Sequence, residues 1–224
     1  MKILVIGEQN SLQECRLKFG EQHSYSWATE FNGAKKDLSH LSVDDVIFDF
    51  CSSDNNQTLE KYNSCQAIVL LNTCKVSLSD MIRSLKDSLR CRFFGFNGMP
   101  TFLNREILEV SVAPNANVDD IKKLCAALNT DYLIVDDRVG LVSPRIVCMI
   151  INEAYYAALD GTASREDIDR AMILGTNYPH GPFEWCTMIG IKHVYELLES
   201  LYNDTHDERY KVCPLLKKDY LVQG

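Results

Sequence analysis

The sequence predicts an α/β protein in which a shortened, Rossmann-like doubly wound sheet precedes an all-α C-terminal domain. The first part of the chain alternates short, continuous apolar runs with helix-length polar segments. This alternation is typical of parallel strands that are covered on both faces. After Asp137 the strand-like runs stop, and apolar residues recur at helical spacing. We therefore expect two domains, residues 1–137 and residues 138–224.

Six apolar runs are the expected strands of the first domain. They are Lys2–Ile6, Val46–Phe50, Ala67–Leu71, Phe93–Phe96, Leu108–Val112 and Tyr132–Val135. Two of the segments between them, Leu78–Leu89 and Val118–Leu128, are long enough to form helices. A repeated order of strand, helix and strand predicts a mainly parallel sheet.

Helical spacing and capping signals define the second domain. Gly161 is placed to end the first helix, and Ser164 with Asp167 is typical of the start of the next. The expected helices are Arg145–Leu159, Arg165–Leu174, Pro182–Ile189 and Lys192–Leu201, followed by a turn around Leu215–Leu221. The first helix is apolar over nearly its whole circumference. We therefore expect it to be buried on all sides, partly in a two-fold symmetric contact with a second copy of the chain.

The composition excludes several classes of partner. The net charge is -8 and no cluster of Lys and Arg exists, so a nucleic-acid partner is not expected, because phosphate binding needs a basic face. No apolar run approaches the roughly 20 residues that span a bilayer, and the N-terminal run is too short for a signal peptide, so no membrane association is expected. The nine cysteines lack paired CxxC spacing. We expect free thiols in a reducing cytoplasm, and no metal site.

Three motifs in the second domain carry a resemblance to a known family. They are Gly161-Thr-Ala-Ser-Arg-Glu-Asp-Ile-Asp169, Tyr178-Pro-His-Gly-Pro-Phe-Glu184 and Cys213-Pro-Leu-Leu-Lys-Lys218. Their order and spacing resemble the C-terminal domain of the 3-hydroxyacyl-CoA dehydrogenases. The resemblance implies an oxidoreductase of fatty acid metabolism that acts on 3-hydroxyacyl-CoA or 3-oxoacyl-CoA, and a homodimer formed through these helices. The same residues also fit helix ends and turns, and we interpret His180 as a packed or surface side chain, so the fold alone does not establish activity.

The turn after the first strand departs from the Gly-x-Gly-x-x-Gly pattern with which that family binds a dinucleotide. Only Gly7 of the three glycines remains. Gln9 would place a side chain where the pyrophosphate approaches, and Glu8 adds an anion. Glu30 has a loose spacing for a ribose contact and could equally be a surface residue. We expect NAD binding to be possible but weak, with Gly7 among the contacting residues.

The segment Asn72–Asp80 resembles the family's stretch Asn-Thr-Ser-Ser-Leu-Ser-Ile-Ser-Asp, where the cofactor and substrate sites meet. The resemblance implies that Asn72 binds the cofactor and that Cys74 lies beside the substrate, where the family has serine. A catalytic thiol needs a lowered pKa and a nearby base. No histidine neighbours Cys74 in the sequence, so we interpret it as a small packing residue at the substrate site.

The segment Arg92–Val110 aligns without a gap with the part of the family that holds its catalytic histidine and glutamate. The histidine position is Asn97, and the glutamate position is Glu109. In the family, the histidine takes the proton of the 3-hydroxyl group and the glutamate orients the ring. An amide cannot serve as a base near pH 7, although it can hydrogen-bond a substrate. Arg105, which the family's pattern lacks, could meet a CoA phosphate or pair with Glu109 or Glu106.

Two hypotheses follow from these positions. A slow or altered 3-hydroxyacyl-CoA dehydrogenase is favoured by the domain order and by Glu109. A non-catalytic acyl-CoA-binding or oligomerising protein on the same scaffold is favoured by Gln9, by Asn97 and by Pro144, which replaces a substrate-binding asparagine of the family. Under either hypothesis we expect Asn97 and Glu109 to be neighbours across adjacent strands, with the Asn97 amide donating to Glu109 and its oxygen facing the substrate.

Overall fold

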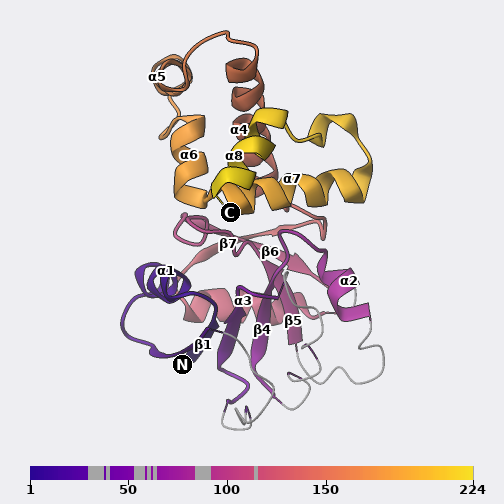
Figure 1. Ribbon diagram of the computed structural model, residues 1–224. Coiled ribbons are helices and arrows are strands. Elements are labelled where there is room, and N and C mark those ends of the chain that lie inside the picture. Colours follow the sequence, from indigo (N-terminus) through magenta and orange to yellow (C-terminus); the bar gives the residue numbers. More distant parts are fainter. Residues whose placement is uncertain are drawn as a thin grey trace. The chain divides into compact units, whose positions relative to one another are not determined.

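The computed structural model describes residues 1–29, 38, 41–52, 59, 62, 65–83, 92–113 and 116–223. These residues form two compact units, Met1–Leu141 and Val142–Gly224, called unit 1 and unit 2 here. Unit 1 is an α/β unit and unit 2 is helical (Figure 1). The predicted fold class is therefore confirmed.

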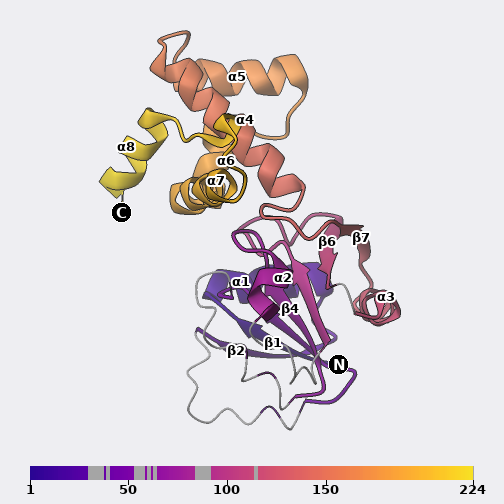
Figure 2. The ribbon, with the colours of Figure 1, turned by 90° about the vertical axis from the view of Figure 1, so that its right-hand side faces the viewer.

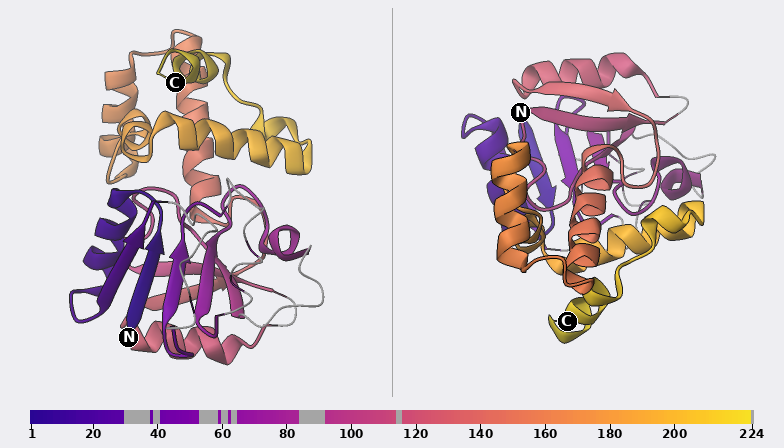
Figure 3. Two further views of the ribbon diagram at one scale, coloured as in Figure 1. Left: turned by 60° about the horizontal axis from the view of Figure 1, so that its bottom comes forward. Right: turned by 90° about the horizontal axis from the view of Figure 1, so that it is seen from above.

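Unit 1 is built on a sheet that has seven strands within the described residues, in the spatial order β2-β1-β3-β4-β5-β6-β7. The strands are β1 (Lys2–Ile6), β2 (Ser24–Ala28), β3 (Val46–Asp49), β4 (Ile68–Asn72), β5 (Arg92–Phe96), β6 (Ile107–Val112) and β7 (Asp131–Val135). The first five strands are parallel, β6 is antiparallel to β5, and β7 is parallel to β6 (Figure 3). All six predicted strands are present. The edge strand β2 was not predicted, because its sequence is largely polar and exposed.

Two apolar clusters cover the two faces of the sheet. Helices α1 (Gln9–Phe19) and α3 (Val118–Ala127) contribute buried residues to the cluster that contains Phe48. Helix α2 (Leu78–Ile82) contributes to the other cluster, which contains Ile47. Successive side chains of a strand point to opposite faces, so the neighbours Ile47 and Phe48 enter different clusters. The sheet is therefore covered on both faces, as its apolar strands predict.

The order of the strands reverses at β1, because β2 lies on one side of it and β3 on the other. In sheets of this kind, ligands bind beyond the carboxyl ends of the strands at the point of reversal. Three predicted site residues belong to this carboxyl edge. Gly7 follows β1, Asn72 ends β4, and Asn97 follows β5.

A carboxylate beyond the end of β7 caps helix α2. The two Asp137 carboxylate oxygens accept the backbone N–H groups of Leu78 and Ser79, both at 2.7 Å. The Ser77 hydroxyl accepts the N–H of Asp80 at 3.1 Å. The helix begins at the predicted residue, and residues 84–89 of the predicted span lie outside the described residues.

Unit 2 contains the helices that the sequence predicted for the second domain (Figure 2). They are α4 (Ser143–Leu159), α5 (Arg165–Thr176), α6 (Pro182–Ile189) and α7 (Ile191–Thr205). The predicted turn around Leu215–Leu221 is a helix, α8 (Pro214–Gln223), and a short 3₁₀ helix η4 (Glu208–Tyr210) was not predicted. The Ser164 hydroxyl accepts the N–H of Asp167, as the capping signal indicates. None of the helices within the described ranges is long and apolar enough to cross a membrane.

Within the single chain, α4 is buried on one side only, and its predicted burial against a second copy of the chain stays a prediction. Val147, Cys148 and Ile151 are buried, but Ile146 is 54% exposed. The buried side also holds Asn152, whose amide donates to the carbonyl of Lys211 and whose oxygen accepts the N–H of Cys213. The other helices of unit 2 thus cover only one side of α4.

Candidate active site

Asn72 joins the carboxyl ends of three strands. Its Nδ2 donates to the carbonyl of Phe50 beyond β3 at 3.1 Å. Its Oδ1 accepts the N–H of Cys74 at 3.3 Å and the N–H of Gly98 beyond β5 at 3.2 Å. A Cβ atom at Gly98 would lie 2.8 Å from Cγ of Asn72, so this glycine makes room for the contact. The Asn72 side chain is thus bonded within the protein, and its predicted role in cofactor binding stays a prediction.

Asn97 is buried, and its side-chain oxygen is engaged inside the protein. Oδ1 accepts the N–H of Met99 and the thiol of Cys74, both at 3.2 Å. The oxygen thus makes two hydrogen bonds inside the protein, and its predicted contact with a substrate stays a prediction. The physical reason for the bond to Met99 is local, because an asparagine side chain readily binds the backbone N–H two residues further on.

Cys74 is fully buried. Burial raises the pKa of its thiol to about 12, although the N–H groups of Gly98 and Met99 favour the thiolate. The thiol is therefore neutral near pH 7 and donates to Asn97. This geometry agrees with the interpretation of Cys74 as a packing residue rather than a nucleophile.

Glu109 and Asn97 adjoin the last residue pair of the ladder between β5 and β6. Phe96 pairs with Val110 in this antiparallel ladder; Asn97 follows Phe96 and Glu109 precedes Val110, so the two residues are close along the backbone. Glu109 is 9% exposed. Its negative charge adds to the effect of burial on the pKa of Cys74 and opposes the effect of burial on the pKa of Arg105. The predicted neighbourhood of Asn97 and Glu109 is therefore supported by the ladder, while a hydrogen bond between them stays a prediction.

Arg105 is half-buried beside an aromatic ring. Its guanidinium lies 3.9 Å from the ring centre of Phe102. Burial lowers the pKa of this guanidinium, and the charge of Glu109 opposes that change. Of the two predicted roles, these surroundings favour an electrostatic partnership with Glu109 over a contact with a CoA phosphate.

The β1–α1 turn does not fit a dinucleotide in the pose that a Gly-x-Gly-x-x-Gly turn provides. A Cβ atom at Gly7 would lie 3.0 Å from both Cβ of Phe50 and Oγ of Ser11, so the glycine serves internal packing. The indole N–H of Trp27 donates to the Gly7 carbonyl at 2.8 Å. Glu8 precedes the first turn of α1 and places a negative charge where the helix would attract a phosphate. The possible ribose contact, Glu30, lies outside the described residues.

Sequence reasoning missed three side chains beside the candidate site, namely Glu14, Lys18 and Trp27. Glu14 and Lys18 bind the segment that follows Asn97. Their spacing of four residues on α1, next to the buried Cys15 and Phe19, was the available signal. That signal does not identify the partners, which lie far away along the chain.

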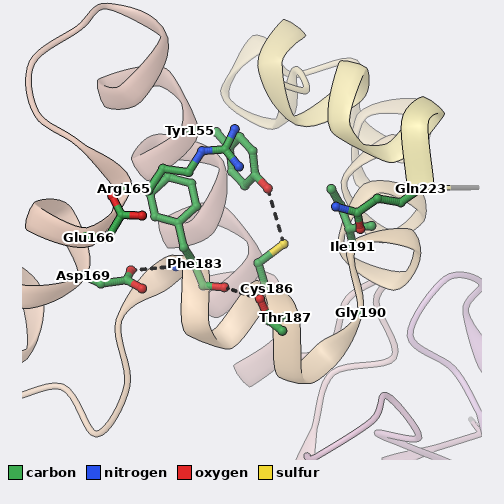
Figure 4. A pocket seen from close by; sticks show the side chains of 10 residues that line it. All are labelled: Tyr155, Arg165, Glu166, Asp169, Phe183, Cys186, Thr187, Gly190, Ile191 and Gln223. Carbon is green, nitrogen blue, oxygen red and sulfur yellow. Dashed lines mark hydrogen bonds between the residues drawn. The ribbon is translucent and has the colours of Figure 1, made fainter.

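A separate pocket of about 400 Å³ lies entirely within unit 2 (Figure 4). The Arg165 guanidinium is 5.1 Å from the ring centre of Tyr155 and 5.2 Å from that of Phe183. Arg165 also pairs with Asp219 at 2.7 Å. The predicted site residues all belong to unit 1, so this pocket is distinct from them. In the described part of the chain, no group of three or more His, Cys, Asp or Glu residues could hold a metal ion.

Comparison with known proteins agrees with this architecture. Residues 140–221 match the family model of the 3-hydroxyacyl-CoA dehydrogenase C-terminal domain. The 3-hydroxybutyryl-CoA dehydrogenase of Clostridioides difficile is 33% identical over 183 residues, which cover 81% of this chain and 64% of the relative. The 3-hydroxyadipyl-CoA dehydrogenase of Escherichia coli (strain K12) is 44% identical over 92 residues, which cover 41% of this chain and 19% of the relative. The chain thus spans less than two thirds of the length of these relatives.

Among solved structures, the (S)-3-hydroxybutyryl-CoA dehydrogenase from Ralstonia eutropha superposes with a TM-score of 0.76 at 18% identity, over 99% of this chain and 94% of that one. At this identity the likeness shows the fold alone. The fold and the residues at its carboxyl edge define an α/β protein of the Rossmann-like class that continues into a helical unit. Within that class, residues 140–221 match the C-terminal domain of the 3-hydroxyacyl-CoA dehydrogenases, and the chain as a whole is similar to 3-hydroxybutyryl-CoA dehydrogenase.

Proposed function

We propose that this protein is a slow 3-hydroxyacyl-CoA dehydrogenase. It binds 3-hydroxyacyl-CoA or 3-oxoacyl-CoA thioesters at the carboxyl edge of the sheet, and any turnover with a nicotinamide cofactor is far below that of relatives with a histidine at position 97. The observation that carries the proposal is the retained Glu109 close to an asparagine in the place of the base. Losing a positioned general base typically lowers a rate by about 10²–10⁴-fold.

A second candidate function, non-catalytic acyl-CoA binding, is favoured by one observation. The Asn97 oxygen already accepts two hydrogen bonds inside the protein. It therefore has little capacity left for a substrate hydroxyl. Calorimetry and an NADH oxidation assay together distinguish the two functions. A non-catalytic binder should bind acetoacetyl-CoA in the calorimeter but should not oxidise NADH, even at saturating cofactor.

The rate prediction is tested by the reduction of acetoacetyl-CoA with NADH. The wild type should be at least about 10²-fold slower than a family enzyme that carries the histidine. Asn97→His should raise the rate where cofactor binds, because Glu109 lies where it can orient the new ring. The matched control is Asn97→His with Glu109→Gln, which should lose most of that gain. Full activity of the wild type would contradict the prediction, because another group would then be the base.

The cofactor prediction follows from Glu8 and Gln9 at the start of α1. We expect NAD(H) to bind with a Kd weaker than about 100 μM, equivalent to roughly 5.5 kcal/mol of binding free energy. Fluorescence energy transfer from Trp27 to bound NADH measures this binding, because the Trp27 indole lies against Gly7. The variant Trp27→Phe shows how much of the signal comes from this tryptophan. Gln9→Gly with Glu8→Ala should tighten binding. A Kd below the micromolar range in the wild type would contradict the prediction.

A homodimer in a reducing cytoplasm is also part of the proposal. The exposed apolar side of α4 supports the homodimer. The cysteines in the described ranges form no disulfide, and seven of them are buried, which supports a reducing compartment.

A further inference from the structure

Two side chains on one side of α1 bind the backbone of the segment that follows β5. Glu14 accepts the N–H of Thr101 at 2.8 Å, and it also accepts the N–H of Leu103. Lys18 donates to the carbonyls of Arg105 and Glu106, the latter at 2.8 Å. Residues four positions apart lie on the same side of a helix. The segment Met99–Glu106, called the 99–106 loop below, therefore runs along α1 and is attached at two points.

The 99–106 loop packs its apolar side chains into the protein. Met99, Phe102 and Leu103 are all buried. Thr101 has a φ of 73°, a left-handed conformation that costs a non-glycine residue free energy. The Glu14 carboxylate binds the N–H of this same residue. Glu14 thus stabilises the loop at its most strained position.

The loop connects to the candidate site at both ends. At its start, the N–H of Met99 donates to the Asn97 oxygen, which also binds the thiol of Cys74. At its other end, Arg105 lies within the electrostatic influence of Glu109. A shift of the loop would therefore displace Asn97 and Arg105 together.

We propose that Glu14 and Lys18 are positioning residues that hold the 99–106 loop against α1 and thereby fix Asn97 and Arg105 in the candidate site. Naming acyl-CoA as the ligand of that site rests on the proposed function, whereas the attachment of the loop does not. A carboxylate with little exposure costs stability unless it is well bonded. Glu14 Oε2 is a buried atom for which the described residues provide no hydrogen-bond partner. The two loop N–H groups on the other side of the carboxylate offset part of this cost.

The test uses matched substitutions on α1. Glu14→Leu removes the acceptor, Lys18→Met removes the donor, and Glu14→Gln keeps an acceptor oxygen and serves as the conservative rescue. Two exposed positions on the same helix provide the controls, Gln13→Leu and Arg16→Met.

Two measurements need no ligand. Hydrogen exchange in peptides that cover residues 99–106 should accelerate at least about tenfold in Glu14→Leu and Lys18→Met, and stay within about threefold of wild type in Glu14→Gln and both controls. Alkylation of Cys74, followed by mass spectrometry relative to the buried Cys148 of unit 2, should accelerate in the same two variants. This second measurement reports on the Asn97 contact directly, because the Cys74 thiol donates to that side chain.

A third measurement is the calorimetric Kd for acetoacetyl-CoA, which should weaken by about tenfold in Glu14→Leu and recover in Glu14→Gln. The proposal is overturned if hydrogen exchange in the 99–106 loop is the same in Glu14→Leu and Lys18→Met as in wild type. It is also overturned if exchange in the loop accelerates while the alkylation rate of Cys74 and the Kd for acetoacetyl-CoA stay as in wild type. It is equally overturned if exchange rises uniformly throughout unit 1, since that would be a loss of global stability. If the wild type does not bind acetoacetyl-CoA, the proposed function fails, and the two ligand-free measurements still decide the positioning role.

Discussion

Asparagines at the ends of β4 and β5 shape the candidate site through backbone contacts. Asn72 and Asn97 each accept the N–H of the residue two positions further on. An Asn side chain stabilises a turn in this way, whereas a catalytic base must keep its lone pair for the substrate proton. At position 97 the side-chain oxygen thus stabilises a turn of the backbone.

Glu14 should make stability depend on pH. Burial raises the pKa of its carboxyl group above 4.5, so the folded protein binds this proton more tightly than the unfolded chain does. The resulting stabilisation is fully present below the unfolded-state pKa and is lost as the pH rises through the raised folded-state pKa. We therefore expect the free energy of unfolding of wild type, relative to Glu14→Gln, to fall as the pH is raised from about 4 towards neutrality.

Urea unfolding at a series of pH values measures this difference. The control is Glu21→Gln, which changes an exposed carboxylate that pairs with Arg16. Its difference from wild type should be much flatter over the same range. If the difference in the free energy of unfolding between wild type and Glu14→Gln did not change with pH, the prediction would be contradicted. The Glu14 carboxyl group would then have the same pKa in the folded and unfolded chain.

The sequence could predict some of these residues and not others. Asn97, Glu109 and Cys74 were found because they occupy positions of a family motif that aligns without a gap. The contact between Glu14 and Thr101 could not be found, because the two residues are 87 positions apart and only the fold brings them together. Nor did the motif indicate that the Asn97 oxygen binds Met99, since a sequence pattern does not give the rotamer of a side chain.

At the scale of elements, strands were predictable where both of their faces are buried. β3 and β4 are continuous apolar runs, and every one of their residues is buried. β2 lies at the edge of the sheet, and its sequence Ser-Tyr-Ser-Trp-Ala carries no such run. Helix caps were predictable where the capping residue is local, as at Ser164. The cap of α2 by Asp137 comes from a residue 59 positions away from Leu78 and was therefore not visible.

Asp137→Ala should release the start of α2. The substitution removes the acceptor of two N–H groups in the first turn, and loss of a capping side chain typically costs about 0.5–2 kcal/mol. The free energy of unfolding, measured in urea, should fall by about this amount. Asp136→Ala, at the exposed neighbouring position, should stay within about 0.5 kcal/mol of wild type. Equal effects of the two substitutions would show that the cap does not stabilise the helix.

At the scale of the whole molecule, the exposed side of α4 leads to a prediction about assembly. Ile146 is 54% exposed on a helix whose sequence is apolar over most of its circumference. We expect the wild type to be a dimer by light scattering at micromolar concentration, and Ile146→Glu to shift it to the monomer, because a charge does not tolerate burial in an apolar contact. Leu17→Glu, at a 78% exposed position on α1, should leave the dimer intact. A monomeric wild type would contradict the proposal.

The order of strands in unit 1 has a consequence for how the chain folds. β6, α3 and β7 follow one another directly along the chain, and β6 and β7 are neighbours in the sheet. β1 instead pairs with β3, so the whole of α1 and β2 must be looped out before Ile3 meets Val46. Closing a short loop costs less conformational entropy than closing a long one, and local pairings form faster. We therefore expect the β1–β3 ladder at the candidate site to form after the pairings between strands that are consecutive in the chain, such as β1 with β2 and β6 with β7.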